Sequence, residues 1–111
     1  MPAPALGTLE LSILLAVARL GDGAYGLAVR RDVSHRSGHD YSVGAVYTTL
    51  QRLETKGLVS SRTAGPLPVR GGRSRRHFKV TATGRRALSE AQRRAASIWS
   101  GLGASINPEP T

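Results

Sequence analysis

The chain has 111 residues, enough for one compact domain with at most a short projecting element. Its 16 Lys and Arg against 7 Asp and Glu give a formal net charge of +9. This excess favours a polyanionic partner, nucleic acid or an anionic membrane surface, over a merely soluble cationic surface. The absence of cysteine excludes disulfides, thiolate metal sites and cysteine nucleophiles. We expect neither a leader peptide nor a membrane-spanning segment, and therefore a cytoplasmic protein.

The first predicted helix runs from Leu9 to Leu20 and has Thr8 as its N-cap. It ends at Gly21–Gly23, because glycine accepts the left-handed conformation that closes many helices. The helix is apolar on nearly every side, which indicates burial on more than one face. It is therefore either the central helix of the core or a helix that also packs against another subunit.

A second, shorter helix is predicted to begin at Tyr25–Gly26 and to end at about Val33 or His35, with Leu27 and Val33 directed inward. A Ser-Gly-His-Asp turn follows it. His35 and His39 are four residues apart, a spacing that on a helix brings two histidines to one metal ion. The glycine and the turn composition argue against a helix there, so we expect solvated turn histidines and no metal.

The third predicted helix starts at Ser42, a good N-cap, and stops at Gly57. Tyr41 and Val46 occupy the two positions of a hydrophobic staple. On a helical wheel, four apolar residues share the face that should pack on the first two helices. These residues are Val43, Val46, Leu50 and Leu53.

The opposite face of this third helix is small and almost uncharged. It consists of Gly44, Ala45, Thr48 and Arg52, with Thr49 and Lys56 at its margins. A face without acidic residues can approach DNA closely, because nothing on it repels phosphate. An ordinary solvated face would mix Glu and Lys more evenly, so the pattern favours a helix that reads a DNA groove.

Two alternating segments, Leu58–Thr63 and Arg76–Thr81, predict the strands of a hairpin. The loop between them, 64–74, contains two prolines, which a regular ladder excludes. Ser61–Val80 holds six Arg or Lys and no Asp or Glu, so it supplies +6 of the net charge of +9. We expect its arginines to bind phosphates or a minor groove, the alternative being a basic loop without a partner.

The last predicted helix runs from a Thr83 cap to about Leu102, and its apolar residues recur at steps of three and four. This is the spacing of a short coiled-coil seam. The seam consists of Leu88, Ala91, Ala95, Ile98 and Leu102. It predicts a dimerisation arm, and the alternative is packing back on the first helix. Both hold if Leu9 and Ile13 of the first helix join the same dimer interface.

These elements predict a mainly α protein with a small β-hairpin (α+β), a winged helix-turn-helix followed by a dimerisation helix. The DNA-binding domain is expected at 1–82, with the wing at 58–81. The dimerisation helix is expected at 83–104 and a tail at 105–111. No carboxylate is paired with a histidine or a nucleophile in a recognisable motif, so we expect neither an enzyme nor a cofactor.

Three segments in this order resemble the PadR-like transcriptional regulators, across roughly Leu6–Leu102. They are Leu9–Gly26, Ser42–Val59 and Gly71–Gly84. The resemblance implies a dimeric winged-helix repressor of the short branch, whose single last helix mediates dimerisation. Some short members bind flat aromatic compounds between paired tryptophans on this helix, which makes Trp99 either a ligand contact or an interface residue. The proline-rich wing and the alanine-rich last helix depart from the family pattern.

The resemblance implies that Ser42–Lys56 is the recognition helix. It also implies that the arginines Arg73, Arg75 and Arg76 are the basic positions of the wing. The candidate DNA contacts from residues and resemblance together are Tyr25, Ser42, Gly44, Tyr47, Thr48, Thr49, Arg52, Arg70, Arg73, Arg75 and Arg76. The leading hypothesis is a homodimeric, sequence-specific repressor of a pseudo-palindromic operator in double-stranded DNA, relieved by a small aromatic ligand. The alternatives are a non-specific architectural nucleic-acid-binding protein and a protein-interaction module on the same fold.

Overall fold

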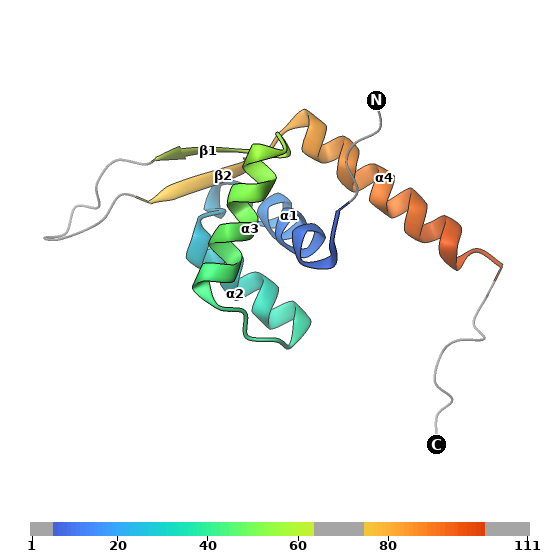
Figure 1. The fold of residues 1–111 in the computed structure, drawn as a ribbon, viewed down its shortest axis with the longest axis horizontal. Coiled ribbons are helices and arrows are strands. Elements are labelled where there is room, and N and C mark those ends of the chain that lie inside the picture. The colour runs from blue at the N-terminus through green and yellow to red at the C-terminus, as the bar shows by residue number, and fades with distance from the viewer. Residues whose placement is uncertain (1–5, 64–74, 102–111) are drawn as a thin grey trace, which may run out of the picture.

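The computed structural model describes residues 6–63 and 75–101. The described chain is mainly helical with one two-stranded antiparallel sheet, which confirms the predicted fold class. Its elements are α1 (Thr8–Leu20), η1 (Gly21–Gly23), α2 (Gly26–Ser37), α3 (Val43–Thr55), β1 (Val59–Thr63), β2 (Arg76–Val80) and α4 (Ala82–Trp99). In Figure 1, α3 crosses in front of α1, the hairpin projects to one side and α4 leaves on the other.

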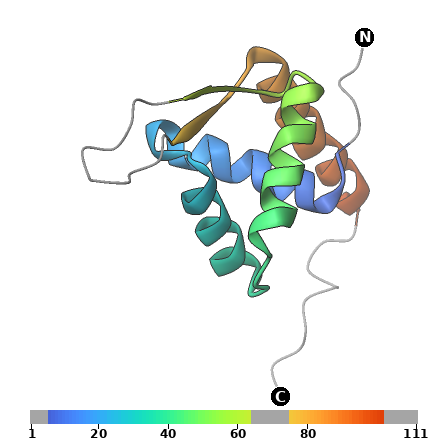
Figure 2. The same ribbon diagram turned by 60° about the vertical axis from the view of Figure 1, so that its left-hand side comes forward.

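The hydrophobic core lies between the first three helices and the base of the hairpin. Its largest fully buried side chains are Ile13, Leu14, Val17, Val29, Val33, Val46, Leu50, Leu53, Leu58 and Val59. In Figure 2, α1 runs behind α3 with α2 beside both, so α1 is covered on several faces. Burial within one subunit therefore accounts for Ile13, Leu14, Ala16 and Val17 of α1, whereas Leu15 remains 38% exposed.

The hairpin is fastened to the helical body at its base. The register pairs Val59 with Val80 and Thr63 with Arg76. Phe78 faces the core, and its amide donates a 2.8 Å hydrogen bond to the carbonyl of Ala24 in the connection before α2. This hydrogen bond fixes the base of the hairpin to the α1–α2 connection.

Two helix starts differ from the sequence prediction. Gly7, not Thr8, is the N-cap of α1, and its amide donates to Glu10 Oε1 at 3.1 Å. Thr81, not Thr83, caps α4, because its hydroxyl accepts from the Gly84 amide at 3.0 Å and donates to the Gly57 carbonyl at 2.7 Å. The second of these bonds joins segments far apart in sequence, so local pattern could not reveal it.

Two apolar residues expected to face inward are instead exposed. Leu27 of α2 is 50% exposed, and Val43, the first residue of α3, is 44% exposed. α2 also continues to Ser37, beyond its predicted end, and closes on Gly38 with φ +70°. A helical wheel assigns a face to each side chain, but it does not say how far the neighbouring helices extend along that face.

Candidate nucleic-acid interface

The outward face of α3 is exposed, mostly polar and free of acidic residues. Ser42 begins the helix, and its Oγ accepts a 3.1 Å hydrogen bond from the Ala45 amide, as predicted for an N-cap. The exposed residues along the helix are Ser42, Val43, Gly44, Tyr47, Thr48, Gln51, Arg52, Thr55 and Lys56. Such a face can enter a groove of DNA without repelling phosphate.

Two polar residues of α3 are withdrawn from this face. Glu54 is partly buried, and its carboxylate accepts a hydrogen bond from Ser61 of β1. Thr49 is only 4% exposed, and its hydroxyl donates to the Ala45 carbonyl at 2.8 Å. This internal hydrogen bond lets a threonine turn inward, so the structure argues against the sequence expectation that Thr49 contacts DNA.

The two cations at the end of α3, Arg52 in its last turn and Lys56 at its C-cap, have different surroundings. Lys56 Nζ lies 2.6 Å from Glu10 Oε2 of α1, so its charge is engaged within the domain. The hydrogen bond from Lys56, with a second from the Gly7 amide, holds the pKa of Glu10 below its ordinary value of 4.5. Arg52 is exposed and has no salt bridge within the described part of the chain. Arg52 is therefore the α3 cation available to a partner.

The glycines near this face have opposite surroundings. A Cβ at Gly44 would meet no atom within 4 Å, so packing does not require glycine there. A Cβ at Gly26, the first residue of α2, would lie closer than 3.0 Å to the phenol of Tyr47. Tyr47 thus rests its ring on α2 and remains 42% exposed. It fixes the spacing of α2 and α3 while its other side borders the outward face.

Tyr25 connects the start of α2 to the wing. It forms a β-bridge with His77, and the two rings meet edge to face with their centroids 5.5 Å apart. The guanidinium carbon of Arg75 lies 4.7 Å from the centroid of the Tyr25 ring, a cation–π geometry. His77 Nδ1 is also 3.2 Å from the Asp22 carbonyl oxygen. The predicted sites Tyr25 and Arg75 are therefore neighbours, and Arg76, at the start of β2, is exposed beside them.

Ion pairs engage the acidic residues of α2 and of the turn that follows it. Asp32 accepts hydrogen bonds from Arg19 of α1 and Arg36 of α2. Burial alone would raise the pKa of Asp32, but these hydrogen bonds outweigh it and hold the pKa below its ordinary value of 3.8. Arg30 donates to the Tyr41 carbonyl at 2.7 Å and pairs with Asp40, which holds the α2–α3 turn in place.

The predicted dimer seam on α4 changes its surroundings along the helix. Leu88 and Ala91 are partly buried, whereas Ala95 is exposed and Ile98 is 73% exposed. Trp99 is 56% exposed. On α1, Leu9 is partly buried but Ile13 is fully buried within the subunit, which argues against Ile13 as a dimer contact. Three predicted site residues lie outside the described residues: Arg70, Arg73 and Leu102.

Two further searches of the described residues concern metal ligands and membrane spans. Among residues 6–63 and 75–101, no group of three or more His, Cys, Asp or Glu could hold a metal ion. His35 lies in α2 and His39 lies beyond the Gly38 cap, so the helical spacing of the two histidines is lost. No helix in this part of the chain is long and apolar enough to cross a membrane.

A family model described as "Transcriptional regulator PadR-like family" matches residues 14–90. Transcriptional regulator Rv3488 of Mycobacterium tuberculosis (strain ATCC 25618 / H37Rv) is 43% identical over 58 residues, which are 52% of this chain and 50% of that protein. The chain thus spans about half the length of this curated relative.

Solved structures of similar fold agree with the family match. A PadR family transcriptional regulator from Eggerthella lenta DSM 2243 superposes with a TM-score of 0.65 at 25% identity, over 91% of this chain and 89% of that one. The hsRosR-S4 complex of H. salinarum RosR gives 0.67 at 25% identity, over 90% and 79%. A PadR family regulator from Clostridium difficile R20291 gives 0.68 at 20% identity, over 91% and 100%, which bears on the fold alone.

Proposed function

We propose that this chain, which belongs to the PadR-like family of transcriptional regulators, is a homodimeric, sequence-specific DNA-binding repressor of the cytoplasm. The observation that carries the proposal is the outward face of α3, which is exposed and free of acid. The exposed arginines Arg75 and Arg76 lie on the neighbouring hairpin, at the end of the paired strands where Thr63 pairs with Arg76. Reading a duplex requires contacts to base edges and contacts to phosphates, which the acid-free face of α3 with Arg52 and the arginines of the hairpin can supply.

In the proposed complex, α3 enters the major groove. Gly44 lets the helix backbone approach the base edges, and Thr48 offers a hydroxyl to them. Arg52 can form a bidentate hydrogen-bond pair with guanine, the commonest specific contact in this groove. Ser42 lies at the start of the face, and Tyr47 borders it while it rests on Gly26.

The wing supplies contacts to the DNA backbone. Arg76 is exposed, and Arg75 is placed by its stacking on Tyr25. Each phosphate that the protein neutralises should steepen the plot of log affinity against log salt by about 0.9. Binding should therefore weaken sharply as salt rises, and we expect Arg70 and Arg73 of the wing to contribute in the same way.

Two copies should bind together through the exposed end of α4. Ile98, at 73% exposure, and Ala95 form an apolar surface that a single subunit leaves in water. A two-fold dimer would place its recognition helices in successive major grooves, about 34 Å apart, on an inverted repeat. Trp99 of each copy would then lie near the dimer axis, where a flat aromatic ligand could insert and change the angle between the two heads.

Selection of bound duplexes from a random pool at about 150 mM salt tests this function. Recovery of an inverted repeat with half-sites about one helical turn apart supports a dimeric operator reader. Recovery of unselected sequence contradicts it and favours the architectural alternative. On the selected site, Thr48→Ala and Arg52→Gln should each lose about 1–3 kcal/mol of specific binding while non-specific binding barely changes.

The matched control is Arg36→Gln, which removes the same charge as Arg52→Gln from a residue that pairs with Asp32 away from α3. Arg36→Gln should bind the selected site with the affinity of the wild type. Relief by a ligand is tested separately, by titrating planar aromatic compounds into the protein–operator complex. If no compound that quenches Trp99 fluorescence changes operator affinity, the proposed relief is wrong.

A further inference from the structure

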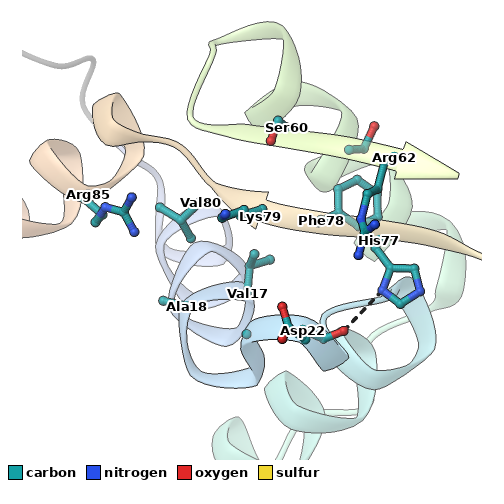
Figure 3. A pocket seen from close by; sticks show the side chains of 12 residues that line it. Val17, Ala18, Asp22, Ser60, Arg62, His77, Phe78, Lys79, Val80 and Arg85 are labelled. Atoms are coloured by element: carbon teal, nitrogen blue, oxygen red, sulfur yellow. Dashed lines mark hydrogen bonds between the residues drawn. The ribbon is translucent and has the colours of Figure 1, made fainter. Parts of the chain in front are cut away.

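A hollow of about 440 Å³ lies between the end of α1 and β2, on the side shown in Figure 3. This volume is within the range of about 300–1,000 Å³ that small-molecule sites usually have. Its floor is the outer edge of the core, formed by Val17, Phe78 and Val80, with Ala18 beside them. No residue of α3 lines it, so the hollow is separate from the proposed DNA-reading face.

Cations gather around this apolar floor. Arg62 comes from β1, Lys79 from β2 and Arg85 from the first turns of α4, and all three are exposed. Within the described part of the chain, none of the three has a carboxylate within salt-bridge distance. The single acidic residue among the lining side chains is Asp22. The hollow therefore combines an apolar floor with a surplus of unpaired positive charge.

We propose that this hollow binds a small organic anion with an apolar body. The body would cover Val17 and Phe78, and the anionic group would meet the three cations at the rim. Hydrogen bonds from arginine and lysine are charge-assisted, and an anionic acceptor gains more from them than a neutral one because both partners are then ionised. A phosphate of duplex DNA would satisfy the rim but could not cover the floor, so the apolar body distinguishes this ligand from the operator.

Three naphthalenes with different charges test the proposal on the full chain without DNA: 2-naphthoate, 2-naphthylmethanol and 2-naphthylmethylammonium. Amide signals in two-dimensional NMR report where each compound binds. We expect 2-naphthoate to shift the signals of Val17, Ala18 and Phe78, and to bind at least about tenfold more tightly than the neutral alcohol. The ammonium compound should bind most weakly of the three.

Arg85→Gln and Arg86→Gln form a matched pair on α4. Both remove one charge from neighbouring exposed residues, but only Arg85 lines the hollow. We expect Arg85→Gln to bind 2-naphthoate about tenfold more weakly than the wild type. The affinity of Arg86→Gln for 2-naphthoate should differ from that of the wild type by less than about twofold. Ala18→Phe, which fills the hollow, should abolish the shifts at Val17 and Phe78, with thermal unfolding used to verify that each variant folds.

Four results would overturn the proposal. The first is equal binding of all three naphthalenes, which would mean a hydrophobic patch without charge selection. The second is equal weakening in Arg85→Gln and Arg86→Gln, which would mean attraction to the overall charge alone. The third is a set of shifts confined to Trp99 and its neighbours on α4, and the fourth is no shift at millimolar 2-naphthoate.

Discussion

Replacing Gly44 by alanine should stabilise the domain and weaken its binding to DNA. Gly44 is the second residue of α3, its φ is not positive, and an added Cβ would meet no atom within 4 Å. Alanine is favoured over glycine by about 0.8–1.0 kcal/mol inside a helix, and we expect about half of that in the first turn. For a domain of this size, about 0.5 kcal/mol raises Tm by roughly 2–4 °C.

The effect on DNA binding should have the opposite sign. A methyl group at this position would project from the outward face between Ser42 and Thr48, where the helix is proposed to come closest to the base edges. Pushing α3 outward weakens several groove contacts together, and a dimer carries the change twice. We therefore expect operator affinity to fall by at least about tenfold, equivalent to about 1.4 kcal/mol.

Thermal unfolding and fluorescence anisotropy with the selected operator, at one salt concentration, measure the two effects on the same sample. Gly84→Ala is the control, because its Cβ would lie closer than 3.0 Å to the backbone oxygen of Leu58. It should cost about 1–3 kcal/mol of stability, since a backbone atom cannot easily give way. Operator binding by Gly44→Ala at wild-type affinity would refute the close approach of α3, and a fall in its Tm would refute the packing argument.

Arg76→Gln should reduce the slope of log affinity against log salt by about 1.8 for a dimer, because it removes one phosphate contact per copy; an unchanged slope in salt titrations excludes that contact. Ile98→Asp should raise the dimer dissociation constant at least about a hundredfold in sedimentation experiments, whereas an unchanged value would place the interface elsewhere. The Lys56 hydrogen bond lowers the pKa of Glu10, so the ionised carboxylate stabilises the fold above pH 4.5 and this contribution is lost as pH falls. Urea unfolding should therefore show a smaller loss of stability from about pH 6 to about pH 3 in Glu10→Gln than in the wild type, and equal losses would contradict this.

Local patterns predicted α3 well because its signals are local. Ser42 caps the helix through a side chain three residues from its partner, and Gly57 follows it with φ +77°. The wheel placed Val46, Leu50 and Leu53 in the core correctly but misplaced Thr49, since a hydroxyl bound to its own helix becomes compatible with burial. Polarity alone therefore does not show which side of the helix a threonine occupies.

The rest of the site depends on contacts between distant parts of the chain. Arg75 and Tyr25 are fifty positions apart, and the sequence around each gives no sign that the guanidinium lies over the ring. The same holds for Tyr47, whose ring rests on Gly26. In the sequence, Tyr25–Gly26 predicted only the start of a helix. Ile13 was placed in a dimer interface because an apolar pattern does not specify which chain buries it; the structure buries it within one subunit.

The sequence gives the net charge of +9, but only the fold shows where the charged groups lie relative to α3. Near α3 the carboxylates are engaged: Glu10 with Lys56, Asp40 with Arg30, and Glu54 with Ser61. Glu10 and Asp40 are thus paired with cations, the latter at the surface, and Glu54 is hydrogen-bonded and partly buried, so the outward face of α3 carries no negative group. The exposed cations of the hairpin then lie beside a surface without acid, so contacts to phosphate and contacts to bases come from adjacent but different elements. A chain of the same composition with these acids on the face of α3 would keep the net charge but would lose the surface that can enter a DNA groove. The placement of the acids therefore argues more strongly for specific DNA recognition than the net charge does.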